Sequence, residues 1–155
     1  MKKIILLACF WISGAHASDT TDDSPIVPQS VWLNPGFHSY HFNRDEHFRE
    51  NNYGLGIQVA FSPSNSVMAG QYRNSDNDES HYIGWVWQPV NIDSARIGLV
   101  AAAVDGYPGG GQWFAAVLPL ISFEYRSIGI NFYVTPSYKE RVNGALVAQF
   151  KLRVW

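Results

Sequence analysis

The chain has 155 residues, a formal net charge of −2 at pH 7, and hydrophobic, aromatic and charged fractions of 46%, 15% and 15%. This balance disfavours a nucleic-acid-binding protein, because such proteins need a clustered basic face. The single cysteine, Cys9, lies in an N-terminal leader, so the rest of the chain offers neither a disulfide nor a catalytic thiolate.

The leader is typical of a secretory signal peptide over residues 1–17. Lys2 and Lys3 precede an apolar run, and Ala15 and Ala17 frame a small-x-small cleavage site. The apolar run is too short for a spanning helix of about 20 residues. A lipobox that ends at Cys9 is the alternative.

The next segment, residues 18–35, is polar and is then interrupted by Pro25, Pro28 and Pro35. Prolines at this density prevent a stable amphipathic helix. We therefore expect an extended periplasmic entry segment here, followed by a single folded domain over residues 36–155.

Eight segments of this domain carry the pattern of β-strands. The clearest is residues 53–61, where large apolar side chains share one face and small or polar side chains share the other. The predicted strands are residues 37–43, 53–61, 66–73, 82–87, 95–104, 113–123, 128–134 and 145–155. They predict an all-β fold, an eight-stranded antiparallel transmembrane β-barrel of the outer membrane, closed by a last strand that runs to the C-terminus.

The aromatic residues also favour a membrane wall. An aromatic fraction of 15% is high for a small soluble domain, whereas a barrel places aromatic side chains at the membrane boundaries. In the last strand, however, Trp155 shares a face with Lys151 and Arg153, opposite the apolar stripe. Either Trp155 turns inward or the strand bends near its end.

The connections between the predicted strands alternate in length. The short ones are residues 62–66, 89–94 and 124–127, and the generally longer, more polar ones are residues 43–52, 74–80, 105–112 and 135–144. Short periplasmic turns and longer outer loops are the asymmetry of outer-membrane barrels. We therefore expect most charged side chains at the outer rim.

The first two predicted outer loops and the adjoining strand ends hold the candidate reactive side chains. His38 and His41 lie at the first loop, and Ser75 and Asp76 lie in the second. A histidine and an acid grouped with a serine suggest nucleophilic or general-base acyl chemistry. Because His38 and His41 are three residues apart in a strand, they point to opposite faces and only one enters a given site. The acids around Asp76 match no tight-binding metal loop, so we expect no metal and no cofactor.

Two further features bear on the entry of a lipid chain. Glycines at five predicted lumen positions would leave room for an acyl chain, because an eight-stranded barrel is otherwise filled by its side chains. These residues are Gly54, Gly56, Gly84, Gly98 and Gly129. Pro119 and Pro136 each remove an N–H donor from the ladder and would open a lateral gap between lumen and bilayer. Alternatively, Pro136 only ends its strand.

Three motifs in this chain are similar to the PagP family of outer-membrane lipid A palmitoyltransferases. They are Arg73-Asn74-Ser75 before Gly84 in a Tyr- and Trp-rich strand, residues 117–125, and the aromatic-x-x-Pro ending at Pro136. The resemblance implies an eight-stranded barrel that holds one acyl chain and has proline-marked lateral access. It also implies transfer of a palmitoyl chain from a phospholipid to lipid A by a His, an Asp and a Ser at the outer rim, without a cofactor.

Carried over residue by residue, the family serine falls on Ser75 and the family histidine falls on His38 or His41. The family aspartate falls on Asn74, which removes the carboxylate from that position, and Asp76 or Asp78 is the candidate replacement. The amphipathic helix that precedes the barrel in this family has no counterpart in residues 18–35.

The leading hypothesis is an acyltransferase in the outer membrane of a Gram-negative bacterium, with a phospholipid as donor and the lipid A of lipopolysaccharide as acceptor. One alternative is a non-catalytic small barrel that binds lipopolysaccharide or a partner through its outer loops. Another is a lipid A deacylase, although the chain has no His-x-Ser-Asn motif.

Overall fold

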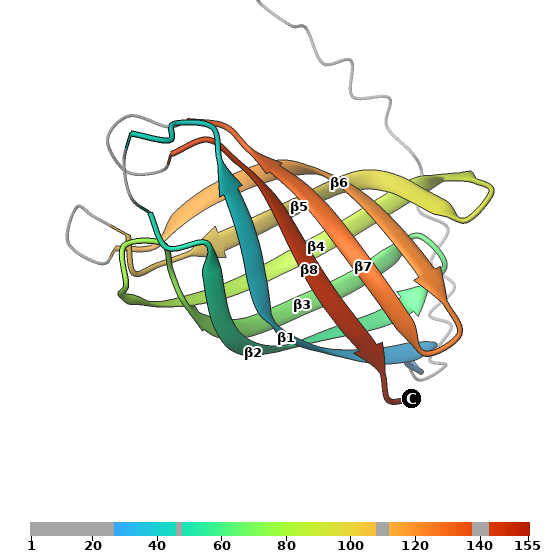
Figure 1. Ribbon diagram of the computed structural model, residues 1–155. Helices are drawn as coiled ribbons and strands as arrows, with labels where there is room; N and C mark the ends of the chain where they lie inside the picture. The colour runs from blue at the N-terminus through green and yellow to red at the C-terminus, as the bar shows by residue number, and fades with distance from the viewer. Residues whose placement is uncertain (1–26, 46–47, 108–111, 138–142) are drawn as a thin grey trace, which may run out of the picture.

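Eight strands make up the regular structure in the computed structural model, which describes residues 27–45, 48–107, 112–137 and 143–155. They are β1 (Ser30–His41), β2 (Asn51–Ser62), β3 (Asn65–Arg73), β4 (Glu79–Ile92), β5 (Ala95–Val104), β6 (Phe114–Tyr125), β7 (Ile128–Thr135) and β8 (Ala145–Arg153). Each strand pairs antiparallel with the next, and β8 pairs with β1 to close the barrel (Figure 1). The predicted eight-stranded antiparallel barrel is confirmed, whereas the predicted leader at residues 1–17 lies outside the described residues.

In the described part of the chain, no helix is long and apolar enough to cross a membrane.

β1 begins at Ser30, earlier than the sequence predicts. The expected entry segment over residues 18–35 is therefore wrong for its last part, because Ser30 to Asn34 pair with β2 in the barrel wall. The register with β2 shifts between Asn34 and Gly36, and Gly36 has a φ of 107°. This irregularity lets Pro35 lie inside a strand, since a bulged residue leaves the ladder.

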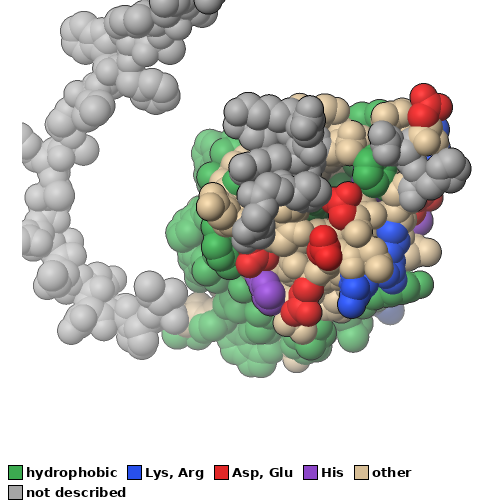
Figure 2. Space-filling model, turned by 90° about the vertical axis from the view of Figure 1, so that its left-hand side faces the viewer, with side chains coloured by type: hydrophobic (Ala, Val, Ile, Leu, Met, Phe, Trp, Pro, Cys, Tyr) green, Lys and Arg blue, Asp and Glu red, His purple; other side chains and the backbone are tan. Residues whose placement is uncertain are grey.

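The outward face of the barrel is apolar. Tyr53, Leu55 and Ile57 of β2 are 66%, 63% and 41% exposed, whereas the next inward residue, Gln58, is 3% exposed. Figure 2 looks at one end of the barrel, where charged side chains are visible, with apolar side chains around the sides. The alternation therefore points large hydrophobic side chains away from the lumen, as a barrel in an apolar surrounding requires.

The last strand follows the same rule. Phe150 and Leu152 point outward and Lys151 is buried in the lumen. The regular strand ends at Arg153, but the N–H of Val31 still donates to the carbonyl oxygen of Trp155 at 2.8 Å. Because the Trp155 side chain is 60% exposed at the barrel end, the alternative in which it turns inward is wrong.

The two ends of the barrel differ in their connections. One end, here called the turn end, carries the tight turns at residues 63–64, 93–94 and 126–127. The other, here called the loop end, carries the connections at residues 42–50, 74–78, 105–113 and 136–144. Asp93 and Arg126 adopt positive φ values of 52° and 53°, as tight hairpin turns require. The predicted asymmetry of short turns and longer loops is confirmed.

The lumen at the turn end is filled by a buried polar network, here called the polar plug. It consists of Gln58, Ser66, Gln88, Ser122, Asn131 and Gln149. Asn131 accepts a hydrogen bond from the Ser122 hydroxyl at 2.7 Å and donates to Oε1 of Gln149 at 3.0 Å. Beside the plug, Glu124 pairs with the buried Lys151 at 2.6 Å and with Arg96. Most of these groups bond to one another, which lowers the cost of their burial, whereas Nε2 of Gln149 and Nε of Arg96 have no partner among the described residues.

One seam of the barrel is only half paired. The ladder between β6 and β7 runs from Tyr125↔Ile128 to Leu120↔Tyr133 and stops there, one residue short of Pro119. On its other side, β6 pairs with β5 along its length up to Phe114. The ladder thus ends next to Pro119, and the lateral gap expected at this proline stays a prediction. Pro136 follows directly after the last residue of β7, so it also ends its strand.

Candidate functional site

A cavity of about 130 Å³ occupies the lumen between the polar plug and the loop end. Its walls are mostly apolar and include Phe37, Met68, Val100, Ala102, Val104, Leu118 and Val147. The Tyr133 hydroxyl donates to Oε1 of Gln149 at 2.8 Å, so Tyr133 joins the cavity to the plug beneath it. Cavities of roughly this volume, about 150 Å³, admit a ligand of the size of benzene when their lining is apolar. The lining suits an apolar ligand that enters from the loop end.

Polar side chains line the mouth of this cavity. They are Ser39, His41, Asn52, Ser75, Asp76, Thr135 and Asn143. An apolar pocket with a few convergent polar groups at one end is the usual form of a small-molecule site. The mouth is therefore the candidate functional site.

His41 is the last residue of β1 and points into the cavity mouth. Its side chain is 6% exposed, and its ring centroid lies 4.8 Å from that of Phe48. Among the described residues, four buried side-chain atoms lack a hydrogen-bond partner, and two of them, Nδ1 of His41 and Oδ1 of Asn52, belong to residues at the mouth. Buried polar atoms without partners are uncommon and cost free energy. Both atoms therefore mark a place where a polar group of a ligand fits.

The connection between β3 and β4 is organised around Asn74, which is 0% exposed. Oδ1 of Asn74 accepts hydrogen bonds from the backbone N–H groups of Asp76 and Asp78 at 3.0 and 2.9 Å. Nδ2 donates to the Ser80 hydroxyl at 3.0 Å and to the Gly106 carbonyl oxygen at 2.7 Å. An Asx turn of this kind fixes the path of the backbone. It holds the following residues, Ser75 and Asp76, at the cavity mouth.

Asp76 keeps part of its side chain open to solvent at the mouth. Partial burial raises the pKa of Asp76, the negative charge of Asp78 adds to the rise, and His41 opposes it. His41 and Asp76 both line the mouth, so a positive charge on the imidazole would be attracted to the carboxylate across the opening. A carboxylate in this position stabilises an imidazolium that forms during proton transfer. One opening thus carries a base in His41, a carboxylate in Asp76 and a hydroxyl in Ser75.

The structure brings three of the five predicted catalytic residues to the cavity and places the other two elsewhere. His38 faces outward, with Nδ1 2.9 Å from Oδ1 of Asn51, so its assignment to the site is wrong. The expectation that His38 and His41 face opposite sides is confirmed, and His41 is the one at the mouth. Asn74 does not line the cavity and acts as a positioning residue for the loop.

The predicted lumen glycines point inward but do not line the cavity. A Cβ atom on Gly54, Gly56 or Gly98 would overlap a neighbouring backbone or the Tyr82 side chain. On Gly129 it would lie 2.9 Å from Cε of Lys151, and on Gly84 it would lie 3.0 Å from Cβ of Ala102. The prediction that Gly54, Gly56, Gly84, Gly98 and Gly129 leave room for an acyl chain is therefore wrong. These glycines make room for other parts of the barrel.

Several residues of the site were missed by the sequence analysis. Ser39 lies two residues before His41, and the Ser39 hydroxyl accepts a hydrogen bond from Nδ2 of Asn52 at 2.8 Å. The hydroxyls of Tyr72 and Tyr107 lie 2.8 Å apart at the cavity wall. Strand alternation was the available signal for Ser39, since residues two apart share a face. Nothing local in the sequence pairs Tyr72 with Tyr107, because they come from β3 and from the connection after β5.

No metal site is evident in the described ranges, where no three His, Cys, Asp or Glu side chains are grouped to hold an ion. Predicted candidates such as Asp76 and Asp78 remain part of the loop described above. No protein-family model matches the chain, and no curated protein matches its sequence.

Proposed function

We propose that the chain is an outer-membrane acyltransferase that moves a palmitoyl or similar chain from a phospholipid to lipid A. The observation that carries the proposal is the apolar cavity whose mouth holds His41, Ser75 and Asp76. A cavity of this size holds only part of a hydrocarbon chain, and the polar groups at its opening suit the ester at the end of that chain. The resemblance to the PagP family supports the choice of donor and acceptor.

The outward face of the barrel supports a position in the membrane. Large apolar side chains such as Leu55, Trp85 and Phe150 are exposed on the wall, and a closed barrel leaves no unpaired strand edge in lipid. Longer connections face the cell exterior in outer-membrane barrels, so the loop end faces outward. In this orientation the cavity opens at the external leaflet, which contains lipopolysaccharide.

The half-paired seam supports a lateral route for the donor lipid. Leu118 of β6 lines the cavity and belongs to the stretch beyond Leu120, which has no β7 partner. Pro119, at the start of this stretch, has no N–H with which to complete the ladder. An acyl chain in the bilayer would reach the cavity between β6 and β7 while its headgroup stays at the membrane surface.

The polar groups at the mouth supply the chemistry of acyl transfer. The hydroxyl oxygen of the acceptor attacks the carbonyl carbon of the phospholipid ester while His41 takes its proton, and Asp76 stabilises the imidazolium. The Ser75 hydroxyl donates a hydrogen bond to the developing oxyanion. When the ester C–O bond breaks, the lysophospholipid oxygen leaves and receives the proton from His41. Atoms and charges balance without a cofactor.

Mass analysis of lipid A from cells with and without the protein tests the proposal. A gain of one acyl chain supports it. Loss of one chain would instead indicate a deacylase, and an unchanged lipid A profile would favour the non-catalytic barrel. The matched control is Ser75→Ala, which keeps the loop anchored through Asn74 and should abolish the mass gain at equal amounts of folded protein.

The geometry weakens one reason for the non-catalytic alternative. That reason is the asparagine at position 74, where the resembled family has an aspartate. Asp76 lines the cavity mouth and Asn74 does not. The site therefore has a carboxylate from Asp76, although residue 74 is an asparagine.

A further inference from the structure

Two arginines at the loop end carry charges that no described carboxylate neutralises. Nη1 of Arg49 donates to Oδ1 of Asn77 at 2.9 Å, and Nη1 of Arg73 donates to the Asn77 carbonyl oxygen at 2.6 Å. Within the described ranges, no acid lies within 4.0 Å of either guanidinium, whereas Arg44 nearby is paired with Glu50. The guanidinium groups of Arg49 and Arg73 therefore both bind to Asn77.

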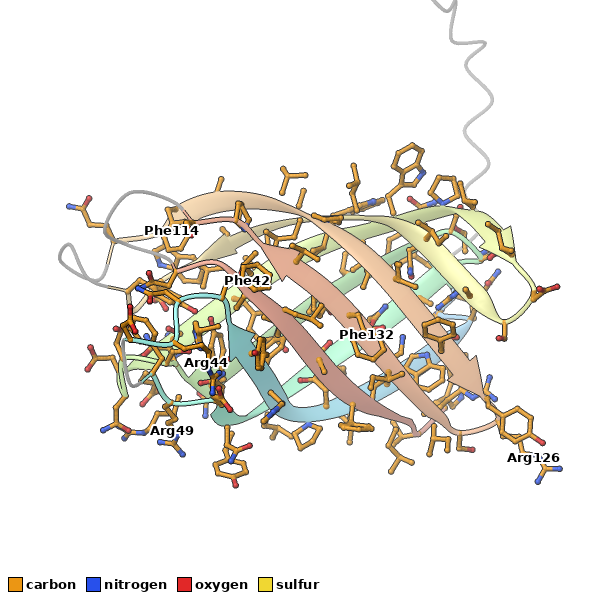
Figure 3. All side chains as sticks on the ribbon, turned by 45° about the horizontal axis from the view of Figure 1, so that its top comes forward. Phe42, Arg44, Arg49, Phe114, Arg126 and Phe132 are labelled. Carbon is orange, nitrogen blue, oxygen red and sulfur yellow. The ribbon has the colours of Figure 1, made fainter. Side chains whose placement is uncertain are left out.

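These groups lie on the outside of the barrel. Arg73 ends β3 at an exposed position, and the Arg49 guanidinium lies 5.5 Å from the ring centre of the outward-facing Tyr53. Figure 3 shows Arg49 at the loop end with its side chain directed away from the wall, and Arg126 at the opposite end. Arginine beside an exposed aromatic ring is typical of the boundary between membrane and water, where lipid phosphates lie.

The donors of both side chains are only partly used. Arg49 donates through Nε to the Asn51 carbonyl oxygen at 2.7 Å and through Nη1 to Asn77. Arg73 uses Nη1 alone. Since a guanidinium has five N–H donors in a planar fork, each group keeps donors that suit the oxygens of a phosphate.

The same loop connects this surface to the cavity mouth. The N–H of Arg49 donates to the Ser75 carbonyl oxygen at 3.2 Å, and Arg73 precedes Asn74 in the chain. Ser75 and Asp76 line the cavity, whereas Arg73 and Asn77 are exposed and are not part of its lining. A lipid held by its phosphate on the outer side would thus present its sugar hydroxyls at the rim beside the mouth.

We propose that Arg49 and Arg73 form a binding site for a phosphate group of lipid A on the outer wall at β2 and β3. The site deepens the proposed function, because it would position the acceptor glycolipid beside His41. The choice of lipid A over a phospholipid rests on charge, since a phosphate monoester carries more negative charge than a phosphodiester and better complements two guanidinium groups that no carboxylate of the described residues neutralises.

Direct binding tests the site without relying on acyl transfer. The full chain is reconstituted in phosphatidylcholine vesicles, and energy transfer from its tryptophans to dansyl-labelled bisphosphorylated lipid A is measured. Arg49→Gln combined with Arg73→Gln should weaken binding about 100-fold, at about tenfold for each charged hydrogen-bonding group. Arg44→Gln is the matched control and should leave binding unchanged, because Arg44 is already paired with Glu50.

Three results would overturn the proposal. They are unchanged binding by the double variant, an equal loss of binding for lipid A stripped of its phosphates, and equal competition by phosphatidylglycerol. The first denies the site, the second assigns the effect to folding, and the third assigns the site to anionic lipids in general. Binding that depends on both arginines in a barrel that transfers no acyl chain would support the site and reject the acyltransferase. Acyl transfer with an unchanged KM for lipid A in the double variant would do the reverse.

Discussion

Replacing Asn74 with aspartate separates a structural role of this residue from a lost catalytic one. If the asparagine had replaced a catalytic carboxylate, Asn74→Asp would restore or raise activity. The hydrogen bonds of Asn74 predict the opposite, because its Nδ2 donates to the Gly106 carbonyl oxygen and its Oδ1 accepts two backbone N–H groups inside the loop. We expect Asn74→Asp to destabilise the barrel and to reduce transfer.

The magnitude follows from the contacts that change. The bond from Nδ2 to Gly106 at 2.7 Å becomes a contact between two oxygens, which loses about 1 kcal/mol of hydrogen bonding and adds repulsion. The Ser80 hydroxyl can rotate and donate, so that bond survives. A negative charge at a position that is 0% exposed, close to Asp76 and Asp78, costs about 1–3 kcal/mol more despite the two N–H donors. The free energy of unfolding should fall by about 2–4 kcal/mol at neutral pH.

Urea unfolding of the refolded barrel in detergent measures this change, with Asn43→Asp as an exposed control at the same end. Burial raises the pKa of the introduced carboxyl in the folded state above its unfolded value. The deficit should therefore be complete above the raised folded pKa and should disappear as the pH falls below about 4, where both states are protonated. Unchanged stability together with increased acyl transfer would refute the structural role of Asn74.

Three further substitutions test the site and the barrel interior. His41→Gln should lower kcat for acyl transfer by about 10²–10⁴-fold through loss of the general base, whereas the outward His38→Gln should not, and a kinetic comparison at equal folded amounts decides between them. Ala102→Leu should shorten the transferred acyl chain by filling the cavity wall, while Ala101→Leu on the outward face of the same strand should not; mass spectrometry of the product reads the length. Asn131→Ala should reduce the free energy of unfolding by about 2–4 kcal/mol, because several buried polar partners lose their bonds, yet leave transfer per folded molecule unchanged.

The architecture of the barrel was predictable because it depends on a strictly local rule. Alternation of side chains along a strand fixes which residues face outward, and it identified residues 53–61 as a wall strand without any tertiary information. The same rule separated His38 from His41, although it did not say which of them enters the lumen. Closure of the barrel decides that question, because it sets which face of β1 is inside.

The start of β1 was not predictable from the same rule. Proline and glycine usually mark the end of a strand or a turn, so the entry segment was expected to end at Pro35. In the barrel, a register shift between Asn34 and Gly36 absorbs both residues. Whether a proline ends a strand or lies at a bulge depends on the partner strand, which the local sequence does not contain.

The glycines failed as a predictor of lumen space for a related reason. An inward glycine leaves a volume, but a side chain from another strand decides whether that volume stays open. Tyr82 of β4 illustrates this, because its hydroxyl occupies the space that a Cβ on Gly56 of β2 would need. The same hydroxyl donates to Oδ1 of Asn34 at 3.2 Å. Contacts of this kind join residues far apart in the chain and leave no periodic signal.

The division of the lumen into a polar half and an apolar half argues for the kind of ligand that enters it. Near the turn end, inward positions carry amides and hydroxyls that bond to one another, as Asn131 does with Gln149. Near the loop end, the corresponding positions carry Val104 and Val147, whose apolar side chains cannot form hydrogen bonds with a polar ligand. Tyr133 stands between the halves with its hydroxyl committed to the plug. A chain entering from the loop end therefore gains by burying hydrocarbon down to Tyr133, and its polar end is best placed beside His41 at the mouth, where buried polar atoms have no partner among the described residues.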